Sequence, residues 1–432
     1  MGDARYLAVK LLDKTFGSGS YSNLQLDSGL KNSDLDDREK KLCSAIYYGV
    51  IERKLTLDHI IGGLSSRPIA KLDSIILNIL RCGIYQIMYM DSVPDNAAVS
   101  ESVSLAKKFR KTSASGMVNA VLRSFIRGGR EIKLPKDREK AMSVKYSAPV
   151  ALVRSLSSDY GSEAAEKFLA ASLEKSVTYL RMNAIRCTEE EFLGALEGFG
   201  AEKIADCCFK TSGGDAASAE AFRKGWFHVQ GLASQLCCQA VAPTEEDRVL
   251  DICAAPGGKT FPIAELMGGK GEIYAFDLHE KRAELIRRGA ERLGLTNIRA
   301  AAGDATKFNP ELPRFTKILC DVPCSGLGVI GSKPEIKYKS MSDFERLPEI
   351  QFKIKIVCNA LNYLEAGGTL VYSTCTVRRA ENEEVCERLL REHPEVEAVE
   401  LPPMLGRSFG TMATLMPPDF GSGFFIAKFR KK

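Results

Sequence analysis

The sequence predicts a multidomain protein in which an all-α region precedes an α/β region built on a parallel, doubly wound sheet. Leu, Ile, Val and Tyr recur at three- and four-residue spacing over residues 4–127, which is the spacing of amphipathic helices. From residue 226 onward, strand-like apolar runs alternate strictly with helix-like segments, as in sheets covered by helices on both faces. A charged stretch marked by Gly and Pro, residues 128–140, separates the two regions.

The expected elements fill three domains in chain order. With roughly 150 residues per domain as a guide, a chain of 432 residues has room for three. We expect a helical domain over residues 1–130, a linker and small α+β segment over 131–225, and the α/β domain over 226–432. The middle segment combines helix-like spacing with the strand-like run VTYLRMN.

The composition is that of an ordinary globular protein. It is 45% hydrophobic and 27% charged, and no apolar run reaches the roughly 18 residues that a membrane span needs. The first residues, MGDARYLAVK, lack the pattern of a signal or transit peptide, so we expect a cytoplasmic protein without a membrane partner. The net charge of +5 and several short basic clusters permit an anionic partner.

Thirteen irregularly spaced cysteines in a chain without a secretion signal favour a reducing compartment and reduced thiols. Two pairs, Cys207-Cys208 and Cys237-Cys238, are adjacent, C-x-x-C does not occur, and the four histidines are scattered. We therefore expect no metal site.

The stretch VLDICAAPGGKT, residues 249–260, reads as a strand, a glycine-bearing turn and the start of a helix. A phosphate-binding P-loop would require glycine where Cys253 stands, and the G-x-G-x-x-G pattern is also missing. The turn can still bring main-chain N–H groups against a ligand carboxylate, because glycines permit close approach.

Two acids follow at the ends of the next strands. Asp277 lies about 20 residues after Gly257, where dinucleotide-binding folds place the acid that binds ribose hydroxyls. Asp304 follows the third strand, in position for an adenine amino group. Either acid alone can be a helix cap, but together they predict a nucleoside-bearing ligand.

Two cysteines end the fourth and fifth strands. CDVPCSGLG, residues 320–328, carries Asp321 and Cys324, and LVYSTCT, residues 370–376, ends in Cys375. Ligands of open α/β sheets bind beyond the carboxyl ends of the strands, so the two thiols, an acid and the nucleoside are expected to meet there. A redox pair is the alternative, but it leaves the acids without a role. We favour nucleophilic catalysis, which needs a thiol activated by Lys259 or by the following helix.

Several stretches together resemble the RNA cytosine-5 methyltransferases of the bacterial RsmB/Sun/Fmu type, which act on 16S rRNA. CAAPGGKT, DVPCSGLGV and STCT are similar to the motifs of their catalytic domain. LDHII, LRCGIYQIMYM, VPDNAAVSESVSLAKK and VNAVLR resemble the NusB-like RNA-binding domain that precedes it. The resemblance covers most of the chain in the order of the family and implies a NusB-like domain followed by a Rossmann-like class I methyltransferase domain.

The resemblance implies transfer of a methyl group from S-adenosylmethionine to C5 of a cytosine in RNA, which is expected to be small-subunit ribosomal RNA. By analogy Cys375 attacks C6, which activates the weakly nucleophilic C5. Asp321, protonated or sharing a proton, is expected to hydrogen-bond N3 and stabilise the adduct, and Cys324 to assist the elimination that frees the product. Lys259 is expected near cofactor and substrate, where it lowers the pKa of the thiol.

The resemblance also implies a set of cofactor-binding residues, expected to be Cys253, Ala254, Ala255, Pro256, Gly257, Gly258, Lys259, Asp277, Arg282, Asp304 and Asp321. The helical domain, the middle segment and basic residues such as Lys107, Lys108, Arg110 and Lys111 are expected to contact RNA phosphates in a monomeric enzyme. Two alternatives stay open: a non-catalytic RNA-binding or ribosome-assembly factor that retains the fold, and a methyltransferase acting on transfer RNA or protein.

Overall fold

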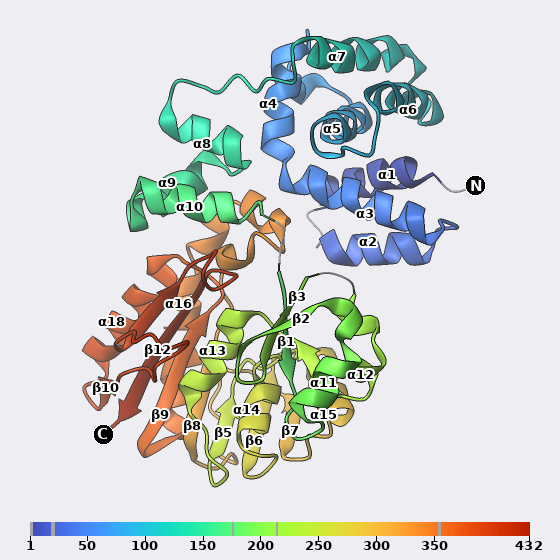
Figure 1. The fold of residues 1–432 in the computed structure, drawn as a ribbon. Coiled ribbons are helices and arrows are strands. Elements are labelled where there is room, and N and C mark those ends of the chain that lie inside the picture. The colour runs from blue at the N-terminus through green and yellow to red at the C-terminus, as the bar shows by residue number, and fades with distance from the viewer. Residues whose placement is uncertain (1–2, 19–21, 175–176, 213–214, 353–355) are drawn as a thin grey trace. The chain divides into compact units, whose positions relative to one another are not determined.

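The structure is a computed structural model that describes residues 3–18, 22–174, 177–212, 215–352 and 356–432 (Figure 1). Packing divides it into two compact units. The first holds the residues up to Leu173 together with Lys333–Lys339, and the second holds Glu174–Ser332 and Ser340–Lys432. The domain ends expected at residues 130 and 225 stay predictions.

The first unit is helical, which confirms the helices expected from the apolar spacing. Helix α5 shows the physical reason: the Asp73 carboxylate caps it by accepting from Ile75 N and Ile76 N, and its apolar positions are buried. The described helices of this unit are α1 (Ala4–Ser18), α2 (Ser22–Lys31), α3 (Asp37–Glu52), α4 (Lys54–Leu64), α5 (Ser74–Tyr89), α6 (Asp95–Lys108), α7 (Ser115–Arg127), α8 (Arg138–Tyr146), α9 (Val150–Tyr160) and α10 (Ser162–Ala171).

A short segment from much later in the chain completes this unit. It contains the 3-10 helix η6 (Pro334–Tyr338). The Tyr338 hydroxyl donates to Ile51 O across 2.7 Å, and Lys337 Nζ donates to Glu52 O across 2.8 Å. Both side chains therefore donate hydrogen bonds to main-chain carbonyl groups at the C-terminal end of α3.

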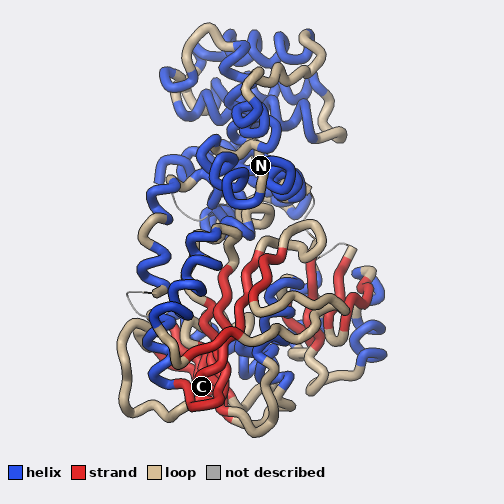
Figure 2. Tube along the Cα trace, turned by 90° about the vertical axis from the view of Figure 1, so that its left-hand side faces the viewer, coloured by secondary structure: helices blue, strands red, loops and turns tan. Residues whose placement is uncertain are grey.

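The second unit contains two sheets, and Figure 2 shows its strands in red. The smaller sheet is antiparallel with the order β2-β3-β1-β4. Its strands are β1 (Thr178–Met182), β2 (Ala201–Ala205), β3 (Cys208–Thr211) and β4 (Phe227–Val229), and the helices beside them are α11 (Glu189–Ala195) and α12 (Glu220–Arg223). Phe192, Phe209 and Phe227 pack together in its core.

The larger sheet has the order β10-β12-β9-β8-β5-β6-β7. The strands β5 to β9 run parallel, as the sequence predicts, whereas β10 and β11 pair antiparallel with β12, which pairs antiparallel with β9. Its strands are β5 (Arg248–Asp251), β6 (Glu272–Asp277), β7 (Ile298–Ala302), β8 (Phe315–Asp321), β9 (Leu364–Thr374), β10 (Val396–Ala398), β11 (Met412–Leu415) and β12 (Phe424–Lys431). The expectation of a wholly parallel sheet was wrong for the last strands, because β12 follows β11 directly and a short connection of this kind joins antiparallel strands.

Helices cover both faces of the parallel strands. Val249 belongs to the core that includes α13 (Leu232–Val241), α14 (Thr260–Leu266) and α15 (Glu280–Leu293). The next residue, Leu250, belongs to the core that includes α17 (Ile356–Tyr363) and α18 (Glu383–Glu392). Successive side chains of a strand point to opposite faces, so burial of both faces explains the continuous apolar runs.

A short helix, α16 (Leu347–Gln351), precedes α17. In the part of the chain that the structure describes, no helix is long and apolar enough to cross a membrane.

Candidate functional site

The carboxyl ends of the parallel strands bring the predicted polar residues to one edge of the large sheet. Asp251, Asp277 and Asp321 are the last residues of β5, β6 and β8. Asp321 lies opposite Ser373 in the register of β8 with β9, and Cys375 follows β9 directly. The central candidate residues therefore lie at one edge of the sheet, beyond which the ligand-binding crevice of such sheets is found.

The two glycines of the turn over residues 253–259 differ in their surroundings, because Gly257 is buried and Gly258 is half-exposed. Gly257 has a φ of +104°, and a Cβ atom there would lie 2.2 Å from the Phe261 ring. At Gly258 a Cβ atom would meet no heavy atom within 4 Å, and Gln230 Nε2 donates to the Gly258 carbonyl oxygen across 2.6 Å. The turn is thus fixed from one side, while its main chain at Gly258 is half-exposed and can be approached closely by a ligand.

Arg282 links this turn to the acid that ends β6. Its Nη2 atom donates to Ala255 O across 2.8 Å and lies 3.4 Å from Asp277 Oδ2. Ala254, whose N–H donates to Phe276 O, is buried like Ala255, whereas Pro256 is exposed and Cys253 is half-buried. The turn and the acid are therefore held together at the place where a cofactor is predicted.

Asp304 lies two residues after β7. Its Oδ1 atom accepts from the Thr306 hydroxyl at 2.6 Å and from Thr306 N at 3.0 Å, and Lys307 lies beside it. These contacts hold the pKa of the Asp304 carboxyl below its ordinary value, so it is ionised at neutral pH.

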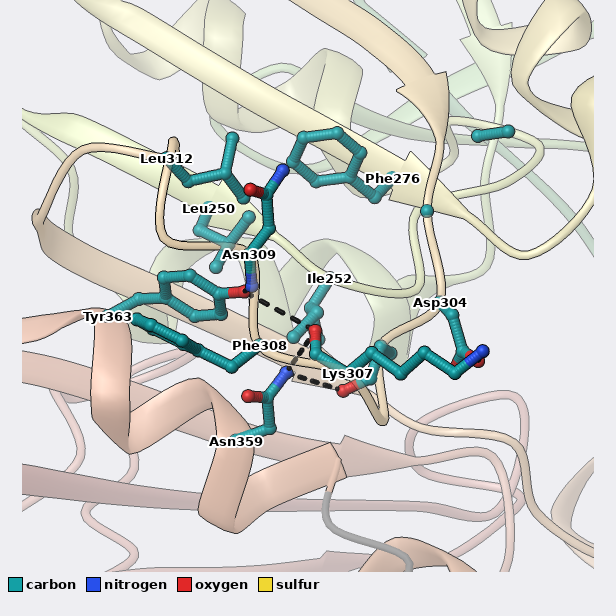
Figure 3. A pocket seen from close by; sticks show the side chains of 13 residues that line it. Leu250, Ile252, Phe276, Asp304, Lys307, Phe308, Asn309, Leu312, Asn359 and Tyr363 are labelled. Atoms are coloured by element: carbon teal, nitrogen blue, oxygen red, sulfur yellow. Dashed lines mark hydrogen bonds and ion pairs between the residues drawn. The ribbon is translucent and has the colours of Figure 1, made fainter.

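A hollow lies beside Asp304 (Figure 3). Asn359 of α17 donates to Ala305 O and Lys307 O, and the Tyr363 hydroxyl accepts from Asn309 N, so α17 fixes the loop that forms one wall. The lining residues are Leu250, Ile252, Phe276, Ala302, Gly303, Asp304, Ala305, Lys307, Phe308, Asn309, Leu312, Asn359 and Tyr363.

Lys259 and Asp321 form an ion pair within the crevice. Lys259 Nζ lies 2.6 Å from Asp321 Oδ2, and the Ser373 hydroxyl donates to Asp321 Oδ1 across 2.9 Å. Burial disfavours the ammonium, but the Asp321 charge outweighs it and raises the pKa of Lys259 above its ordinary value. Both oxygens of the carboxylate are thereby oriented.

The two predicted thiols lie in contact. The Sγ atoms of Cys324 and Cys375 are 3.2 Å apart. This contact, followed by burial, raises the pKa of the Cys324 thiol well above its ordinary value, so Cys324 is protonated at neutral pH. The Lys259 ammonium pairs with Asp321, and the expected activation of the Cys375 thiol by Lys259 stays a prediction.

The sequence analysis missed two residues at the same strand ends. Asp251 is fully buried, accepts from the Thr260 hydroxyl across 2.7 Å, and burial raises the pKa of its carboxyl to about 7. Ser373 orients Asp321. The rule that selected Asp277, an acid at the end of a strand, would also have found Asp251.

Two family models match the chain. Residues 2–127 match the NusB family, and residues 238–430 match the 16S rRNA methyltransferase RsmB/F family. The probable ribosomal RNA small subunit methyltransferase B of Bacillus subtilis is 38% identical over 99% of this chain and 98% of its own length. The protein of the same name from Synechocystis is 34% identical over the full length of both chains. This chain belongs to the RsmB/F family of 16S rRNA methyltransferases.

Solved structures are similar in fold. A methyltransferase homolog protein from Pyrococcus horikoshii is 28% identical, with a TM-score of 0.58 over 67% of this chain and 98% of that one. NSun6 from the same organism, solved with SFG, is 24% identical, with a TM-score of 0.58 over 66% of this chain and 98% of that one. Another solved chain covers 100% of this one at a TM-score of 0.81 and 23% identity.

As a member of the RsmB/F family, this protein is an RNA methyltransferase with an N-terminal NusB-like domain and a Rossmann-like fold. The candidate residues at the edge of its large sheet include thiols, acids and Lys259. Among the described residues, no group of three or more His, Cys, Asp or Glu side chains is arranged to hold a metal ion.

Proposed function

We propose that this enzyme transfers a methyl group from S-adenosylmethionine to C5 of a cytosine in small-subunit ribosomal RNA, through a covalent bond between Cys375 and C6. The observation that carries the proposal is the 3.2 Å contact of Cys324 and Cys375 next to the Lys259–Asp321 ion pair. A redox pair would need the two sulfurs but would leave the ion pair without a role. Carbon methylation of a pyrimidine uses a nucleophile and an acid side by side.

The crevice suits the proposed cofactor. The half-exposed main chain at Gly258 allows close approach of the amino-acid part, and Asp277 is an acceptor for ribose hydroxyls. Asp304 is an acceptor for an adenine amino group. We propose that the remaining members of the predicted set also contact the cofactor. They are Cys253, Ala254, Ala255, Pro256, Lys259, Arg282 and Asp321. When bound, S-adenosylmethionine supplies an electrophilic methyl group on a sulfonium sulfur.

The chain's own residues divide the remaining work. The Cys375 thiolate forms the S–C6 bond while the C5=C6 electron pair shifts toward C5 and N3, and Asp321, sharing a proton with Lys259, hydrogen-bonds N3. Once C5 is methylated, its proton leaves to water and the C5–H electron pair restores the double bond. The S–C6 electron pair returns to the Cys375 sulfur, and the Cys324 thiol donates a hydrogen bond to that sulfur as it leaves.

We propose that the target base leaves any helical stem to enter this crevice. The helical domain over residues 1–130 and the segment over 131–225 would hold the RNA backbone, while the domain over 226–432 carries out the reaction. The names of the relatives support small-subunit ribosomal RNA as the target and hence a cytoplasmic location. We propose that the enzyme acts as a monomer.

The test is methylation of separate RNA pools. Unmodified small-subunit ribosomal RNA and transfer RNA are each incubated with the enzyme and S-adenosylmethionine, and their nucleosides are analysed by mass spectrometry. We expect 5-methylcytidine in the ribosomal RNA with wild type and none with Cys375→Ala. 5-Methylcytidine in transfer RNA alone would favour the alternative substrate, and its absence from both RNA pools would favour an assembly factor.

A further inference from the structure

The loops that carry the two cysteines are braced by one buried carboxylate. Glu381 lies in the 3-10 helix η8 (Arg379–Glu381), shortly after Cys375, and is fully buried. Its Oε2 atom accepts from Ser325 N across 2.8 Å, and Ser325 is the residue after Cys324. A carboxylate delivered by one cysteine loop thus holds the main chain of the other.

Gln351 extends this brace to the other side of Cys324. Its Nε2 atom donates to Pro323 O across 2.9 Å and to Glu381 Oε2 across 3.4 Å. The main-chain groups on both sides of Cys324 are therefore fixed by one connected pair of side chains. These hydrogen bonds restrict the motion of the backbone that carries the Cys324 thiol.

Further contacts join the same two loops. The Ser325 and Thr376 hydroxyls lie 2.7 Å apart, and Gly328 N donates to Cys375 O across 3.0 Å. The residue after each cysteine therefore touches the residue after the other. The two loops are thereby tied together next to the two sulfurs, which lie 3.2 Å apart.

The Glu381 side chain is paired with an arginine in spite of its burial. Arg378 Nη1 donates to Glu381 Oε1 across 3.0 Å, and the Tyr372 hydroxyl donates to the Glu381 main-chain oxygen across 2.6 Å. A buried carboxylate is costly unless it is paired and hydrogen-bonded, as it is here. Its charge also disfavours ionisation of Cys324, in the same direction as the Cys375 contact and burial.

We propose that Glu381 is a positioning residue that holds Cys324, as a thiol, against the Cys375 sulfur for release of the product. This inference rests on the proposed function. Release breaks the S–C6 bond, returns its electron pair to the Cys375 sulfur and sends the C5 proton to water. Glu381 touches none of the reacting atoms and acts only through the backbone next to Cys324.

The proposed role of Glu381 predicts a loss in the rate of S–C6 cleavage and not in the rate of S–C6 formation. Formation of the S–C6 bond depends on Cys375, whereas its cleavage depends on a correctly placed Cys324. In Glu381→Gln we expect one round of methyl transfer to proceed near the wild-type rate and kcat to fall roughly hundredfold, as positional errors near a reacting group can cause. The slow step leaves enzyme joined to methylated RNA.

The experiment compares full-length wild type, Cys324→Ala, Glu381→Gln and Glu265→Gln with unmodified small-subunit ribosomal RNA and S-adenosylmethionine, followed by denaturing electrophoresis. Glu265 is the matched control, because it is also a buried carboxylate, paired with Arg181 in the same unit. We expect an RNA–protein adduct with Cys324→Ala and with Glu381→Gln, and none with Glu265→Gln.

The outcomes distinguish the two proposals. No adduct with Cys324→Ala would overturn the proposed function itself. An adduct with Cys324→Ala but wild-type turnover in Glu381→Gln would overturn the role of Glu381 alone, and so would an adduct with Glu265→Gln, which would make lost stability the cause. If Glu381→Gln fails to fold, Gln351→Met removes the Pro323 contact and should give a smaller amount of adduct, and wild-type release in that variant would also overturn the inference.

Discussion

Lys259 Nζ lies 2.6 Å from Asp321 Oδ2, and this ion pair joins the turn after β5 to the end of β8. Ser373 donates to the second oxygen of the same carboxylate. A carboxylate fixed at both oxygens is already oriented before a substrate arrives, so little reorganisation is needed when charge develops on the base. Because Lys259 and Ser373 contact different oxygens of Asp321, substitutions can test the contribution of each residue to catalysis.

Substitution of Asp321 should slow the chemical step more than substitution of Ser373. We expect Asp321→Asn to lower the single-turnover rate of methyl transfer by about 10²–10³, the range seen when one group that stabilises developing charge is removed. Ser373→Ala keeps the ion pair and should cost roughly tenfold, the equivalent of one hydrogen bond. Rapid-quench measurements with saturating cofactor test this, and equal rates for Asp321→Asn and wild type would contradict it.

Gly257 and Gly258 should respond differently to alanine. Gly257→Ala places a Cβ atom against Phe261 at a φ of +104°, so it should lower the free energy of unfolding by about 1–3 kcal/mol and weaken binding of S-adenosylmethionine. Gly258→Ala meets no neighbouring atom and should leave stability nearly unchanged. Thermal denaturation and calorimetric titration provide the measurements. The account of the turn fails if the two variants lose equal stability.

Lys337 should make stability depend on pH. Burial, together with the nearby Arg53 charge, lowers the pKa of its ammonium to about 7, and the Glu52 charge opposes this only in part. Between pH 7 and about 10 the unfolded chain binds more protons at this residue than the folded chain, so its contribution to stability rises with pH. Lys337→Met removes the penalty and should stabilise the protein most near pH 7, by more than about 1 kcal/mol, and least near pH 10.

Urea denaturation at the two pH values tests the effect of Lys337. Lys339→Met is the control, because it removes a lysine from the same segment at an exposed position. The difference in stability between Lys337→Met and wild type should therefore change between pH 7 and pH 10. A constant difference would show that burial does not shift the pKa of this lysine.

The basic residues at the end of α6 should contribute unequally to RNA binding. Lys108 and Lys111 form ion pairs with Asp3 and Asp73, whereas the described residues give no ion pair for Lys107 or Arg110. Reversing the charges of Lys107 and Arg110 should weaken RNA binding. It should also flatten the salt dependence of binding by about one unit of slope per lost phosphate contact. Reversing the charges of Lys108 and Lys111 should weaken RNA binding less. Unchanged salt dependence in both variants would make these residues ordinary solvated charges.

The sequence was sufficient for the residues that follow from strand topology. The continuous apolar runs predicted buried parallel strands, and the rule that ligands meet the carboxyl ends of such strands brought Asp277, Asp321 and Cys375 together. The antiparallel β12 could not be predicted in this way, since its direction depends on its pairing with β9 and β11 and not on its own apolar pattern.

Other features depend on contacts that leave no local pattern. Lys333–Lys339 joins the helical unit through Lys337 and Tyr338, whose polar atoms reach carbonyl groups at the end of α3. The brace at Glu381 has the same character, because an acid shortly after Cys375 reads as an ordinary surface charge until its partner Ser325 is known. Periodicity reports which face of an element is buried, but not which distant polar group it meets.

The most direct test of the account is to trap the RNA–protein adduct. Wild type, Cys324→Ala and Cys375→Ala are mixed with unmodified small-subunit ribosomal RNA and S-adenosylmethionine, denatured, and separated by electrophoresis. The account predicts that an adduct accumulates with Cys324→Ala alone, because the bond from Cys375 to C6 then forms but is not released. Accumulation with Cys375→Ala alone would reverse the roles of the two thiols, and the absence of both adduct and methyl transfer would contradict covalent catalysis altogether.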